Sequence, residues 1–137
     1  MTTLTLDQAV TTFGVTVDDH HNLDTLIPVL DGLQFQGDVA VVPSPTVTAA
    51  TTPLPTGGVP VVRGEAGGNT HLLLGTGPVT FDTRDDRSGL LLGVLTVAPG
   101  GEAYLAHPEH AYSGIAPGTY ELRRQREQAD EIRMVAD

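Results

Sequence analysis

The stretch LLLGVLTV, residues 90–97, decides the fold class because it is apolar almost throughout. A short run of leucine and valine indicates a β-strand that is covered on both faces. Gly93 within the run indicates a bulge or a close approach of another backbone. We therefore expect a central strand here, in which replacing Leu92 or Leu95 with alanine costs a few kcal/mol.

Shorter runs of the same kind lie on both sides of this stretch, separated by clusters of glycine and proline. Their spacing predicts a mainly β fold, either a small antiparallel β-barrel or a sandwich. The uncharged segment SPTVTAATTPLPTGG, residues 44–58, is typical of an extended surface loop. The strands we expect cover residues 38–42, 59–63, 70–74, 79–82, 90–97, 102–107 and 119–126.

Residues 1–36 differ in sequence pattern from the rest of the chain, and we predict that they form an N-terminal arm on a β-domain of residues 37–137. Apolar residues at helical spacing, a capping residue and a terminating glycine predict a helix of about two turns near the start. These residues are Leu6, Ala9, Val10 and Phe13, with Thr5 as cap and Gly14 as stop. A second short element is expected from Asn22, limited by Pro28, and one turn of helix from Asp130.

The arm needs a surface to cover its apolar residues, and the sequence leaves two surfaces open. One is its own β-domain and the other is a neighbouring subunit. The arm contains five aspartates, and the first basic residue of the chain is Arg63. An arginine group near the C-terminus pairs either with acids of its own chain or with the acidic arm of a neighbour. The interface residues we predict are Leu6, Val10, Phe13, Arg123, Arg124 and Arg126.

Composition excludes several classes of function. Seventeen acids against seven bases give a net charge of -10, which disfavours nucleic acid as a partner. The absence of cysteine excludes disulfides, cysteine-ligated metals and thiol nucleophiles. No window approaches the roughly 20 apolar residues of a membrane span, and the first residues do not resemble a leader. No serine triad or phosphate loop is evident, so an enzyme is the less favoured class.

Three histidines form the best candidate metal site. Imidazole and carboxylate groups are ligands that zinc accepts, and the candidates are His71, His107 and His110 with Glu65 or Glu109. His107 and His110 converge only if the HPEH segment forms a tight turn. The alternative, which the sequence favours, is that these rings bind loop carbonyls or face solvent, so that the protein has no cofactor.

Four segments carry a resemblance to a known group of proteins. They are QGDVAVVP (36–43), GEAGGNTH (64–71), HPEH (107–110) and PGTYELRRQRE (117–127). Their order resembles that of small uncharacterised proteins from bacteriophages, plasmids and bacterial mobile regions, for which no activity is settled. Those proteins tend to carry a further histidine at the position that Asn69 occupies here. The arm lies outside the resemblance.

Two functions follow as hypotheses. The first is a non-enzymatic virion protein that decorates or stabilises a bacteriophage capsid and docks on itself or on a capsid protein through its arm. This hypothesis places the chain in the virion or the host cytoplasm. The alternative is a small metal-binding, or metal-dependent, β-barrel protein that holds a divalent ion such as zinc in its histidine cluster.

Overall fold

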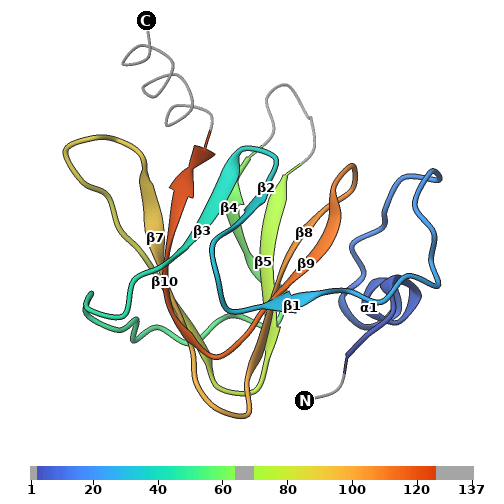
Figure 1. Cartoon of the computed structure of the whole chain (residues 1–137), viewed down its shortest axis with the longest axis horizontal. Coiled ribbons are helices and arrows are strands. Elements are labelled where there is room, and N and C mark those ends of the chain that lie inside the picture. Colours follow the sequence, from blue (N-terminus) through green and yellow to red (C-terminus); the bar gives the residue numbers. More distant parts are fainter. Residues whose placement is uncertain (1–2, 64–69, 126–137) are drawn as a thin grey trace, which may run out of the picture.

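The computed structural model describes residues 3–63 and 70–125 and shows a mainly β protein (Figure 1). One five-stranded sheet has the order β1-β9-β8-β5-β4, and the other has the order β2-β3-β10-β7-β6. The described strands do not close into a barrel, and the arrangement is consistent with a sandwich. The strands are β1 (Val29–Leu30), β2 (Gln34–Gln36), β3 (Val39–Pro43), β4 (Val59–Val62), β5 (His71–Thr76), β6 (Val79–Thr83), β7 (Leu91–Val97), β8 (Glu102–His107), β9 (Ala111–Ile115) and β10 (Gly118–Arg124).

The seven strands expected from the sequence are confirmed as β3 to β8 and β10, with small shifts at their ends. The main core lies between the sheets, where Leu95 and Leu122 are fully buried. Strand β7 lies between β10 and β6 and is therefore not the middle strand of its sheet. A Cβ atom on Gly93 would lie 2.5 Å from the Asp82 carbonyl oxygen of β6, which confirms the close backbone approach predicted there.

The predicted first helix is confirmed as α1 (Leu6–Phe13), with Thr5 and Gln8 forming a capping box and Gly14 ending it at φ 82°. The helix packs on the outer face of the sheet that contains β8 and β9 (Figure 1). The Phe13 ring centroid lies 5.4 Å from that of Tyr104. Of the two surfaces left open by the sequence, α1 therefore covers that of its own β-domain.

The predicted second helical element is wrong. Asn22 instead forms a turn, in which its Oδ1 atom accepts a hydrogen bond from the Asp24 amide and its carbonyl accepts one from Thr25. After Pro28 the chain is extended and forms β1, which pairs in parallel with β9. The turn predicted at Asp130 lies outside the described residues. No helix in the described part of the chain is long and apolar enough to span a membrane.

The loop predicted at residues 44–58 is confirmed as an irregular segment, and Asp82 holds it in place. The Asp82 carboxylate accepts hydrogen bonds from the amides of Thr51 and Thr52 at 2.9–3.2 Å. Hydrogen bonds from the side chain and backbone of Thr52 lower the pKa of Asp82 to about 2. Asp82 lies on strand β6, within the strand expected at residues 79–82, and anchors a neighbouring segment.

Candidate metal centre

Two of the three candidate histidines meet because β5 and β8 are neighbours. His71 is the first residue of β5, and His107 is the last residue of β8. The antiparallel register pairs Leu72 with Ala106, so the next position along each strand places the two histidines side by side. Their ring centroids are 4.3 Å apart.

The third histidine joins them through a tight turn between β8 and β9. His107 pairs with Ala111 across the hairpin, which leaves the three-residue loop 108–110. Ala111 has φ 66°, the left-handed conformation that commonly follows a three-residue hairpin loop. The ring centroid of His110 consequently lies 4.6 Å from that of His107 and 6.0 Å from that of His71. The HPEH segment thus forms the turn that convergence of its two imidazoles requires.

The donor atoms of the three rings lie near one another but not yet at bonding positions. One nitrogen from each ring falls within 4.8 Å of the other two. Zinc–nitrogen bonds of about 2.0–2.1 Å at tetrahedral angles would place the nitrogens roughly 3.4 Å apart. Side-chain movements on the order of 1 Å would therefore bring them into a first coordination shell.

His71 is the buried member of the cluster. Its side chain is only 4% exposed, and neither ring nitrogen has a hydrogen-bond partner among the described residues. Burial and the neighbouring His107 and His110 rings lower its pKa to about 4. The backbone of Gln36 lies near enough to raise this pKa slightly, but it forms no well-aligned hydrogen bond with either ring nitrogen. At neutral pH the ring is therefore uncharged, and its nitrogen lone pair is free.

His107 has a different environment, because its Nδ1 atom accepts hydrogen bonds from the backbone. The amides of Glu109 and His110 donate to it at 3.1 and 3.3 Å. A neutral imidazole that accepts at Nδ1 carries its proton on Nε2. Burial lowers the pKa of His107, so the neutral form prevails here too. Metal binding by His107 therefore requires its ring to exchange these hydrogen bonds for a metal–nitrogen bond.

The two-residue loop between β2 and β3 lies over the histidines. Gly37 has φ 54° in this loop, and type II′ hairpin turns take glycine at that position. A Cβ atom on Gly37 would lie 2.8 Å from His110 Nε2 and 3.0 Å from His71 Nε2. The absence of a side chain at Gly37 therefore leaves space next to two candidate donor atoms.

Acidic groups surround the cluster and favour a cation. Burial and the neighbouring histidines lower the pKa of His71 and His107, but Asp38 opposes this lowering at both rings, and Glu109 and Asp18 oppose it at His107. The opposing contributions come from negative charge near the rings, which attracts positive ions. Among the described residues, the charged groups other than histidine that act on these two rings are all acids.

The arm reaches this site through the segment that follows α1. The Asp18 amide donates to the Pro108 carbonyl at 2.8 Å, and His21 Nε2 lies 2.6 Å from the Glu109 carbonyl. Both contacts fall on the turn that carries His110. The arm therefore supports one of the candidate ligands from outside the β-domain.

The remaining predicted site residues have other places in the structure. Glu65 and Arg126 lie outside the described residues. Arg123 pairs with Glu121 at 3.2 Å and with Asp86 at 3.3 Å, within its own chain. Arg124 is half-buried on β10, where its amide donates to Leu90. Among the predicted arm residues, Leu6 at the start of α1 is buried, and Val10 and Phe13 pack in the same apolar cluster.

Sequence reasoning missed Gly37, Asp38 and His21 as parts of the site. The first two belong to the QGDV segment, which the resemblance singled out without linking it to the histidines. The link depends on the pairing of β2 with β3 and on the position of that hairpin over β5 and β8. The contact of His21 with Glu109 joins residues 88 positions apart, so local spacing gives no sign of it.

Comparison with known proteins gives a family and no function. No curated protein and no solved structure matches the chain. Residues 35–125 match a family described as a domain of unknown function, DUF8820. The match runs from β2 to the end of β10, contains all three histidines and leaves out α1 and β1. It covers well over half of the sequence, and the chain therefore belongs to the DUF8820 family.

Proposed function

We propose that this protein binds a divalent transition-metal ion, with zinc as the reference ion, through His71, His107 and His110. The observation that carries the proposal is that the buried His71 ring has no hydrogen-bond partner among the described residues. A buried imidazole normally satisfies its polar nitrogens, because an unpaired buried polar group costs about 1–3 kcal/mol. Here both nitrogens lack a partner among the described residues, and the ring faces two further imidazoles. A metal ion would satisfy the orphan nitrogen.

The donor set suits zinc and its neighbours in the transition series. Imidazole nitrogen is a preferred ligand for zinc, copper and nickel, whereas calcium and magnesium prefer oxygen. Three protein ligands leave a fourth position for water or another group, as in zinc sites that do chemistry. His110 is exposed, so the open position is reached from the surface. We propose metal binding only, without assigning a reaction, and the fourth ligand is to be identified by experiment.

The test is a zinc titration of the metal-free full chain by calorimetry, with bound metal measured after dialysis. We expect one zinc ion per chain. Replacing His110 with alanine should weaken binding by at least about tenfold, as loss of a metal ligand does. This variant is informative because the side chain is exposed and its removal does not open the core. His71→Phe provides a second variant that keeps the buried volume filled.

The matched control is His20→Ala, which removes an exposed histidine whose ring lies against His21, outside the cluster. It should bind zinc as the unaltered chain does. The proposal fails if the metal-free chain takes up no zinc, or if His110→Ala and His71→Phe both bind zinc with unchanged affinity. Uptake lost equally in His20→Ala would place the ion at the arm instead.

The capsid-decorating role expected from the resemblance stays a prediction. Its proposed route was docking through the apolar face of the arm helix, and this face packs on Tyr104 and Tyr112 of its own chain. A neighbouring subunit would have to displace α1 to use it. Any docking surface of the arm that leaves the fold intact must therefore lie outside this covered face of the helix.

A further inference from the structure

The largest exposed apolar side chains of the described residues all fall in one short stretch. Scattered exposed leucines are ordinary on protein surfaces, but a concentration in one segment marks an interaction site. The stretch includes β1, the turn after it and β2. Its exposed members are Leu23 at 44%, Leu26 at 60%, Leu30 at 45%, Leu33 at 57% and Phe35 at 53%.

Strand β2 has the opposite polarity pattern to the one its place in the sheet would predict. Gln34 and Gln36 point inward and are buried, whereas Phe35 points outward. The inward amides are used, because Gln34 donates to the Gly114 carbonyl and Gln36 donates to that of Leu105. These bonds join β2 of one sheet to β9 and β8 of the other. The outward Phe35 side chain takes no part in these bonds and is 53% exposed.

The same stretch carries two free strand edges. In the described strands, β1 ends the order of one sheet and β2 ends the order of the other. The chain from Val29 to Gln36 passes directly from one edge to the other (Figure 1). An unpaired edge offers backbone donors and acceptors to an added extended segment. The exposed apolar side chains beside such an edge would be buried by that added segment.

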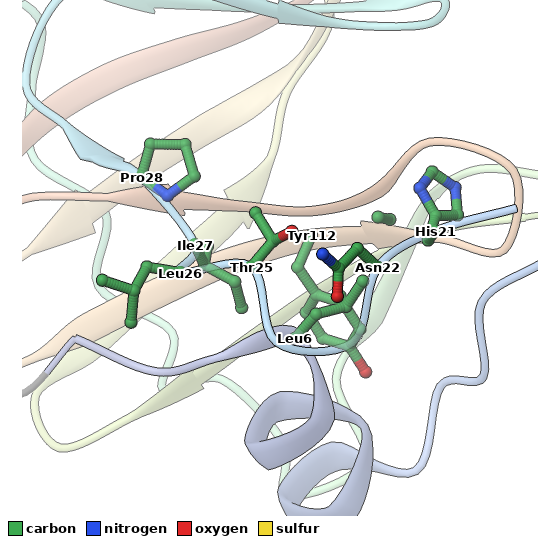
Figure 2. Close-up of a pocket in the computed structure, with 9 residues that line it drawn as sticks. Leu6, His21, Asn22, Thr25, Leu26, Ile27, Pro28 and Tyr112 are labelled. Atoms are coloured by element: carbon green, nitrogen blue, oxygen red, sulfur yellow. The ribbon is translucent and has the colours of Figure 1, made fainter.

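A small pocket of about 100 Å³ lies at the start of the stretch. Figure 2 shows Leu6 and Tyr112 in the middle of its lining, with His21 at one end and Leu26 and Pro28 at the other. This volume is sufficient for one aliphatic side chain. Interfaces commonly gain most of their affinity from one or two such anchors in a pocket.

The negative charge around the stretch indicates the kind of partner that it would bind. Asp24 and Asp31 are exposed within it, and no lysine or arginine precedes Arg63. A second copy would bring the same aspartates together, and an anionic membrane would also be repelled. A segment that carries lysine or arginine between apolar residues satisfies both the charge and the exposed side chains.

We propose that residues Leu23 to Phe35 form a docking surface for an extended segment of another protein that alternates apolar and basic side chains. This surface is separate from the histidine cluster and does not depend on metal binding. It lies on the arm and at the first strand of the DUF8820 match, so most of it is outside the family region.

The experiment uses the full chain and a labelled peptide of alternating leucine and lysine, with binding followed by fluorescence anisotropy. A peptide of alternating serine and lysine measures attraction by charge alone, and one of leucine and glutamate measures apolar contact alone. We expect the leucine–lysine peptide to bind at least about tenfold more tightly than either. In the double variant Leu30→Ser with Phe35→Ser, its affinity should fall to that of the serine–lysine peptide.

Two aspartate variants separate local from overall charge. Asp31→Asn should weaken binding of the leucine–lysine peptide, whereas Asp85→Asn, in the exposed segment before β7, should leave it unchanged. Thermal melting of each variant checks that the fold persists. Equal binding by the double variant, or equal binding of the leucine–glutamate peptide, overturns the proposal. A dimer in sedimentation that the double variant abolishes would assign the surface to a second copy and also overturn it.

Discussion

Gly37 is the residue that keeps the space beside the histidines open. An alanine there would place its Cβ atom 2.8 Å from His110 Nε2, and its positive φ would cost about 1–2 kcal/mol. We expect Gly37→Ala to abolish zinc binding in calorimetry. The control is Gly89→Ala, where φ is 73° and nothing lies within 4 Å of the added atom. Its backbone cost is similar, so retained zinc binding in that variant isolates the steric effect.

Asp82 gives a prediction for the dependence of stability on pH. Its folded pKa of about 2 lies below the ordinary value of 3.8. The carboxylate therefore stabilises the fold fully above pH 4, and this contribution is lost as the pH falls from 4 towards 2. Asp82→Asn should melt at a lower temperature than the unaltered chain at pH 6. The two melting temperatures should converge near pH 2, and a constant difference across this range would contradict the assignment.

Among the elements, the segment after α1 supports the turn between β8 and β9. His21 Nε2 lies 2.6 Å from the Glu109 carbonyl, next to His110. Groups that hold metal ligands in place change metal affinity by about 10–100-fold when removed. We expect His21→Ala to weaken zinc binding by about tenfold with the stoichiometry unchanged. The same affinity in His21→Ala and His20→Ala would show that the arm plays no part in positioning the ligand.

Two leucines of strand β7 look equivalent in the sequence but differ in how deeply they are buried. Leu95 is fully buried between the sheets, whereas Leu92 is half-buried beside the bulge opposite Leu122 and Arg123. Leu95→Ala should lower the free energy of unfolding by about 2–5 kcal/mol, and Leu92→Ala by clearly less. Urea denaturation measures both. Equal losses would mean that Leu92 is as buried as Leu95.

For the whole molecule, the sequence predicts those strands whose apolar residues face the main core. It fails for β1, β2 and β9, each for a physical reason. Strand β2 buries glutamines and exposes Phe35, which inverts the expected pattern. Strand β9 contains Gly114, where a Cβ atom would lie 2.9 Å from the Pro28 carbonyl, so its composition reflects the approach of β1. These features depend on contacts between distant segments, which local pattern does not contain.

The candidate site was predictable to a similar extent. The three histidines stand out by residue type, but the sequence left open whether the HPEH segment forms the tight turn that joins two of them. The meeting with His71 depends on the register of β5 against β8, and the role of Gly37 depends on where its hairpin lies. The sequence favoured the assembly role over the metal hypothesis, because the resemblance pointed to phage-like proteins and Asn69 takes the place of a histidine that those proteins tend to carry. The structure supplies the distances that favour the metal hypothesis.

X-ray absorption at the zinc edge of the full chain, loaded with one equivalent of zinc, tests the central claim most directly. We predict a first shell at about 2.0–2.1 Å that contains three imidazole nitrogens, identified by scattering from the outer ring atoms, with one lighter ligand in the remaining position. In His110→Ala one imidazole should be lost from the shell. A shell of oxygen atoms alone, or an imidazole count unchanged in His110→Ala, would contradict a metal centre built from this cluster.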